Sequence, residues 1–155
     1  MTNLNRREST VDLEKTLELR VAMDDALEGY DKMLEKAEPS FKPTVSELLA
    51  QHNAARRDID ALLRERGTAV DQDGSFMGAV HKTVVTLRSV VDDPDGDWIP
   101  GILDGEKRNL RKYDEAIAET AGEPALQASL LRHREVLQRW VDTLGARRTS
   151  GLKVG

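Results

Sequence analysis

Apolar residues recur along this chain at intervals of three and four, the spacing of one face of an α-helix. No segment shows the alternation of apolar and polar residues that is typical of a half-buried strand. The sequence predicts helices over residues 9–37, 44–66, 75–91, 97–120 and 124–144. The pattern therefore predicts an all-α fold.

Turn residues lie between these segments. Pro39 and Pro43 follow the first predicted helix, and Gly67 follows the second. Thr44 and Glu47 have the spacing of a capping box, which predicts that the second helix begins at Thr44. After about residue 144 the apolar pattern fades.

The predicted lengths and connections favour one architecture. The four longer helices would each be roughly 33 to 43 Å long at 1.5 Å per residue. Short turns join the first helix to the second and the fourth to the fifth, which predicts two antiparallel hairpins. A long middle connection with a short helix over 75–91 separates them. This layout predicts a ferritin-like four-helix bundle with a short extra helix in its long crossover. We expect a frayed segment at residues 1–8, one bundle over 9–145 and a flexible basic tail at 146–155.

Three titratable residues occupy positions where the helical phase calls for an apolar side chain. They are His52, Glu106 and His133, on the second, fourth and fifth predicted helices. Their distances from the predicted turns place all three near the middle of the bundle. On the first helix, Asp25 and Glu28 are expected to face away from the core. Since burying a lone charge costs several kcal/mol, each inward group needs a partner or must be neutral.

Two interpretations of these residues stay open. In the first, His52 is a core histidine that is hydrogen-bonded to Glu106 or Tyr113, and the network fixes the pairing of the helices. In the second, His52, His133 and Glu106 are the ligands of one metal ion, with His81 near the entry. Two histidines and one carboxylate suit iron, zinc or manganese.

Three segments resemble a bacterial family of ferritin-like four-helix-bundle proteins that is defined only as a domain of unknown function. These are ALEGY at 26–30, FMGAVHKTVVTLRSVV at 76–91 and GEKRNLRKYDEAI at 105–117. The resemblance covers about residues 10–145 and implies a ferritin-like fold with no established activity. Members of this family tend to carry a second acidic residue three positions before the one that matches Glu106, where this chain has Leu103.

Ferritin-like proteins that hold two metals use a Glu-x-x-His motif on each of two helices. Here Leu49 and Leu130 lie three positions before His52 and His133. The sequence therefore disfavours a two-metal centre.

Composition narrows the function classes. The 155 residues include no cysteine, which excludes disulfides, thiolate metal sites and cysteine nucleophiles. A net charge of −5 argues against a nucleic-acid partner, and no apolar run approaches the roughly 20 residues of a membrane span. We therefore expect a cytoplasmic, non-enzymatic protein that acts by interaction with a protein partner or as a homo-oligomer, without a cofactor. The alternative is a metal-binding protein.

Overall fold

A computed structural model describes residues 13–68, 87, 90 and 98–154 of the chain, with side chains described as far as residue 147. This part of the chain is all-α. Its four long helices are α2 (Glu14–Lys36), α3 (Lys42–Glu65), α4 (Ile99–Glu119) and α5 (Pro124–Val154). The predicted helix over 75–91, with His81, lies outside the described residues except for Leu87 and Val90.

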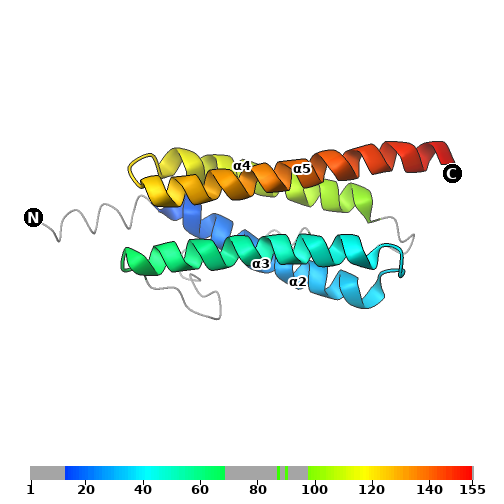
Figure 1. Ribbon diagram of the computed structural model, residues 1–155, viewed down its shortest axis with the longest axis horizontal. Helices are drawn as coiled ribbons and strands as arrows, with labels where there is room; N and C mark the ends of the chain where they lie inside the picture. Colours follow the sequence, from blue (N-terminus) through cyan, green and yellow to red (C-terminus); the bar gives the residue numbers. More distant parts are fainter. Residues whose placement is uncertain (1–12, 69–86, 88–89, 91–97, 155) are drawn as a thin grey trace, which may run out of the picture.

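Each helix packs beside two others. α2 contacts α3 and α4, and α5 also contacts α3 and α4, so α3 and α4 lie at opposite corners of a square. All four contacts are antiparallel, as Figure 1 shows. For example, Thr16 near the start of α2 bonds to Glu119 at the end of α4, while Tyr30 farther along α2 bonds to Glu106. The end of α3 and the start of α4 consequently lie at opposite ends of the molecule (Figure 1).

The core lies along the axis of this square. It contains apolar residues of all four helices and two residues from the connection between α3 and α4, Leu87 and Val90. Both pack on glycines of α4. A methyl group at Gly105 would lie 2.9 Å from Leu87 Cγ, and one at Gly101 would lie 2.7 Å from Val90 Cγ2. The two glycines therefore allow the connection to approach the α4 backbone closely.

The start of α3 differs from the expected cap, and the start of α2 is capped by a residue of another helix. α3 begins at Lys42 rather than Thr44, because Pro43 is favoured in the first turn of a helix. The hydroxyl of Thr44 instead accepts a hydrogen bond from Arg147 of α5 at 2.8 Å. At the start of α2, the backbone N–H groups of Lys15 and Thr16 donate to the Glu119 carboxylate at 2.8 and 2.9 Å. A carboxylate at this position satisfies free N–H groups and complements the helix dipole.

α3 ends where the sequence predicts, whereas α5 continues beyond its predicted end. Gly67 follows α3 with φ of +88°, and the N–H of Thr68 bonds to the carbonyl of Leu63, which confirms Gly67 as the stop. α5 continues to Val154, whereas the apolar pattern predicts that it fades after Leu144. An interior glycine such as Gly145 costs a helix only about 1 kcal/mol, so it does not end α5. Figure 1 shows α5 extending beyond the other helices.

Candidate functional site

Glu106 lies at the centre of a buried polar cluster. Glu106 follows Gly105 in α4, and none of its surface is exposed. The hydroxyl of Tyr30 on α2 donates to Glu106 Oε2 at 2.8 Å. The Nδ2 group of Asn109, one turn along α4, donates to Oε1 at 2.7 Å. The carboxylate therefore links α2 to α4 inside the core.

His52 completes this cluster, which we call the Glu106 cluster: Tyr30, His52, Glu106 and Asn109. The Nε2 atom of His52 lies 2.7 Å from Glu106 Oε2, and only 1% of His52 is exposed. Its ring also stacks on the ring of Tyr30, with centroids 5.7 Å apart. The other ring nitrogen, Nδ1, has no hydrogen-bond partner among the described residues. The predicted hydrogen bond between His52 and Glu106 is thus confirmed.

The environment of Glu106 favours its charged form. Burial by itself would raise the pKa of this carboxyl, but the charge of His52 and the hydrogen bonds from the other three residues outweigh it. The pKa of Glu106 is consequently below its ordinary value of 4.5. Burial and the negative charge of Glu106 raise the pKa of Tyr30 well above 10, and they raise that of Tyr113 as well. Both tyrosines therefore stay protonated around this carboxylate.

His133 has a different partner. It is buried on α5, as predicted, but its Nε2 lies 2.7 Å from Oδ2 of Asp58 on α3. Asp58 is about half exposed and also lies 3.9 Å from Arg132. His133 therefore belongs to the interface between α3 and α5 near the surface, whereas His52 belongs to the Glu106 cluster.

Of the proposed metal ligands, the structure brings His52 and Glu106 into contact. Among the described residues, no three His, Asp or Glu side chains are grouped so that they could hold a metal ion. His52 and Glu106 meet, but His133 does not join them in such a group. His81 lies outside the described residues, so its place relative to this pair stays a prediction.

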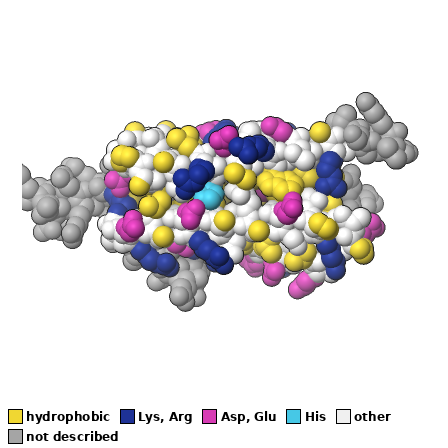
Figure 2. All heavy atoms as spheres, in the orientation of Figure 1, with side chains coloured by type: hydrophobic (Ala, Val, Ile, Leu, Met, Phe, Trp, Pro, Cys, Tyr) yellow, Lys and Arg dark blue, Asp and Glu magenta, His cyan; other side chains and the backbone are white. Residues whose placement is uncertain are grey.

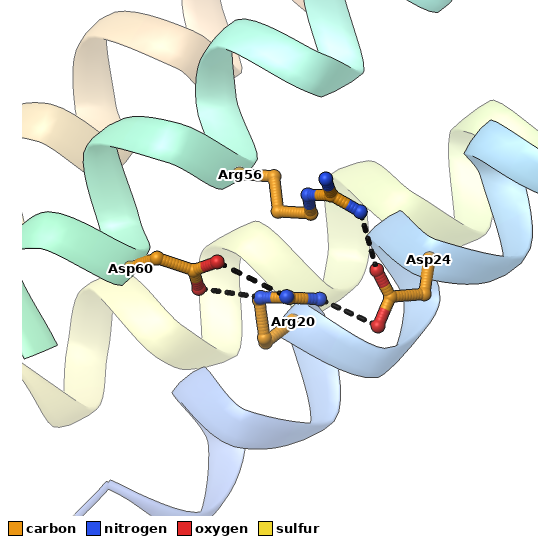
Figure 3. A network of polar contacts seen from close by, with 4 residues as sticks. All are labelled: Arg20, Asp24, Arg56 and Asp60. Carbon is orange, nitrogen blue, oxygen red and sulfur yellow. Dashed lines mark hydrogen bonds and ion pairs between the residues drawn. The ribbon is translucent and has the colours of Figure 1, made fainter. Parts of the chain in front are cut away.

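A second buried charged cluster joins α2 to α3 and was not expected from the sequence (Figure 3). Arg20 is only 2% exposed, and its Nε and Nη2 atoms donate to the two carboxylate oxygens of Asp60 at 2.5 and 3.0 Å. Its Nη1 atom lies 2.6 Å from Asp24, which also accepts from Arg56 at 3.2 Å. Charges of alternating sign thus follow one another across the interface.

The helical phase gives some signal for this cluster. Arg20 follows Leu19 of the inward stripe of α2, and Asp60 follows Ile59 of the inward stripe of α3. Each residue therefore lies at the edge of an apolar stripe, where two neighbouring helices meet.

Asp25 of α2 is buried, although it was expected to face away from the core. The inward face of α2 includes Ala26 and Gly29 beside Asp25, whereas Leu27 is only partly buried.

No helix of the described part of the chain is long and apolar enough to span a membrane. Neither the curated proteins nor the solved structures include a match to the chain. Residues 13–119, more than half of the chain, match the family described as Domain of unknown function (DUF2383). The matched range contains α2, α3 and α4, and with them the Glu106 cluster and the charged cluster around Arg20. The chain therefore belongs to this family of unknown function, DUF2383.

Proposed function

We propose that the chain is a ferritin-like bundle protein that acts by non-covalent association with a second copy or a protein partner, and not by catalysis. One observation carries this proposal. The carboxylate of Glu106 is fully buried and is held by donors from Tyr30, His52 and Asn109. These groups bond to one another, so their polar atoms serve the pairing of α2, α3 and α4.

The helix arrangement supports the ferritin-like part of the proposal. In a bundle built from two hairpins and one crossover, every neighbouring pair is antiparallel. α2, α3, α4 and α5 have this arrangement, and the connection after α3 joins opposite ends of the molecule. An extra helix within that connection stays part of the proposal.

The outer surface supports an associating role. Figure 2 shows basic, acidic and hydrophobic side chains interspersed over the face formed by α3 and α5. Among the described residues, the large apolar side chain that is most exposed is Leu131 on α5, with 49% of its surface accessible. It borders a shallow hollow whose lining belongs to α5 alone. Association that covers Leu131 would remove its apolar surface from water.

Light scattering after size-exclusion chromatography tests the proposal. The purified full-length chain should have a molar mass above that of one chain, and this mass should rise with protein concentration. The substitution Tyr30→Phe, which removes one donor inside the core, should leave the association unchanged. If the purified wild-type protein converts a substrate and Tyr30→Phe abolishes this activity, the proposed role without catalysis is contradicted.

A mononuclear metal site is the second candidate function. The observation that favours it is that His52 and Glu106, a histidine and a carboxylate, meet at 2.7 Å inside the core. The proposed ligands are His52, Glu106 and His133, with His81 near the entry, and the proposed metals are iron, zinc or manganese. Because His133 bonds to Asp58, it would have to leave that partner to join the other two.

Elemental analysis separates the two functions. If a metal site exists, protein purified without a chelator should contain about one metal per chain. The substitution His52→Ala should then remove the metal, whereas Arg132→Ala, at an exposed position on α5, should retain it. Metal far below one per chain, unchanged by His52→Ala, would exclude this candidate.

A further inference from the structure

The outer face of α5 carries a regular row of exposed residues, which we call the outer seam. Their spacing alternates between three and four positions, so they form one line along the helix. The outer seam consists of Ala125, Ala128, Arg132, Glu135, Arg139, Asp142 and Ala146, all of them exposed. It faces away from the core, which α5 contacts through residues such as Leu130, Leu137 and Leu144.

The charges of the outer seam have an internal symmetry. Read from Arg132 to Asp142, they alternate as positive, negative, positive and negative. Leu137 lies midway between Arg132 and Asp142, and also midway between Glu135 and Arg139. If the helix is turned end to end about the position of Leu137, each basic residue therefore takes the place of an acidic one, and each acidic residue takes the place of a basic one.

This symmetry selects one geometry for a pair of identical helices. If two copies of α5 lie antiparallel with a twofold axis at the height of Leu137, Arg132 faces Asp142 of the other copy. Glu135 then faces the other copy's Arg139. A parallel pair would place like charges opposite each other and would be repulsive. Opposite charges across a twofold contact are expected of a self-complementary surface.

The residues around the charges fit the same pairing. The alanines at 128 and 146 are also equidistant from Leu137, so they would face each other at both ends of the contact. Their small side chains allow helix backbones to approach closely. Leu131 borders the outer seam, beside the shallow hollow that Arg132, Glu135 and Arg139 help to line. An antiparallel partner would remove this exposed apolar side chain from water.

Bonds within one chain do not prevent this contact. Arg139 lies 2.9 Å from Glu135 one turn away, and Arg132 lies 3.9 Å from Asp58. These side chains are more than half exposed, except for Asp58 at 49%. Exposed ion pairs of this kind are worth little, so their members can exchange partners at small cost.

We propose that the outer seam of α5 binds the same seam of a second copy, antiparallel and with the twofold axis at the height of Leu137 along the helix. This inference rests on the proposed function and names its partner. It places the contact on a helix outside the residues that match the family.

Charge reversal at the two ends of the pattern tests the pairing. In Arg132→Asp, residue 132 faces Asp142 of an identical partner, and in Asp142→Arg, residue 142 faces Arg132. Each variant alone should dimerise about tenfold to a hundredfold more weakly than the wild type, because two attractive pairs become repulsive. An equimolar mixture should recover the wild-type affinity, since every reversed charge then meets its opposite. Both positions are exposed, so the fold should be retained.

Sedimentation velocity measures the dimerisation of the two variants, of their mixture and of the wild type. Weakened single variants and a heterodimer in the mixture would support the outer seam. A wild type that dimerises with no effect of either reversal would overturn the inference and leave the proposed association intact. A wild type that stays monomeric would overturn both the inference and self-association. Weakened variants whose mixture stays weak would overturn the antiparallel register.

Discussion

Glu106 on α4 and His52 on α3 lie at opposite corners of the helix square, yet their Oε2 and Nε2 atoms are 2.7 Å apart. The two side chains therefore meet across the core axis. Helix neighbours alone would not bring them together, because α3 and α4 each pack mainly against α2 and α5. This diagonal contact ties the first helical hairpin to the second.

Removal of the carboxylate should destabilise the fold strongly. The substitution Glu106→Leu leaves Tyr30, His52 and Asn109 as buried donors without their acceptor. We expect a loss of about 3 kcal/mol or more in the free energy of unfolding. Urea denaturation followed by circular dichroism measures it. The matched control is Glu115→Leu at an exposed position of α4, which should change stability by less than about 0.5 kcal/mol. Equal effects of the two would contradict a structural role for Glu106.

The lowered pKa of Glu106 predicts a pH dependence of stability. The group has a lower pKa in the folded state than in the unfolded state, so its contribution is fully present above the ordinary value of 4.5. That contribution is lost as the pH falls below 4.5 toward the folded-state pKa. The difference in unfolding free energy between wild type and Glu106→Gln should therefore shrink over this acid range.

Denaturation curves at a series of pH values check this prediction. Tyr30→Phe removes one of the hydrogen bonds that lower the pKa of Glu106, so its acid dependence should lie between those of the wild type and Glu106→Gln. A constant difference between wild type and Glu106→Gln across the acid range would show that Glu106 does not titrate in this way.

The Arg20–Asp60 pair predicts a strongly non-additive pair of substitutions. Asp60→Leu leaves the buried Arg20 with Asp24 alone, and we expect a loss of about 2 to 4 kcal/mol. Arg20→Leu together with Asp60→Leu removes both charges from the interface and should cost much less, since apolar pairs often replace buried ion pairs without loss. A double-mutant cycle by chemical denaturation measures the coupling. Additive effects would show that the two side chains do not interact.

The close approach of Leu87 to α4 predicts opposite effects of the same substitution at two glycines. Gly105→Ala places a methyl group 2.9 Å from Leu87 Cγ, so we expect a loss of about 1 to 3 kcal/mol. The control is Gly145→Ala in α5, where the added methyl group meets no described atom within 4 Å. That change should stabilise the protein by about 0.5 to 1 kcal/mol through helix propensity. Thermal unfolding of the two variants tests this, and stabilisation by both would contradict the packing of Leu87 on Gly105.

The helical phase of the sequence predicts most of the core. It correctly predicts four long helices, the burial of His52, Glu106 and His133, and the stop at Gly67. These features depend on residues within one helix and on local backbone preferences, which a single sequence shows directly.

The partners of the buried polar residues were harder to predict. The distances from the predicted turns place His133 at the same height in the bundle as His52 and Glu106. The orientation of α5 about its own axis, however, directs the His133 side chain to Asp58. The start of α2 is stabilised by Glu119, which lies more than a hundred residues away. Arg20 and Asp60 form a pair only because α2 and α3 have one particular register. Such pairings depend on helix rotation and register, which periodicity within one helix does not define.

We propose that the Glu106 cluster serves packing and that the protein acts by association through its outer surface. The most direct test is sedimentation equilibrium of a variant with an apolar cluster. Tyr30→Phe, His52→Leu, Glu106→Leu and Asn109→Leu together strand no buried donor, so this variant should fold. We predict that the wild type self-associates and that this variant does so with the same affinity. A monomeric wild type, or a folded variant that has lost its association, would contradict the account.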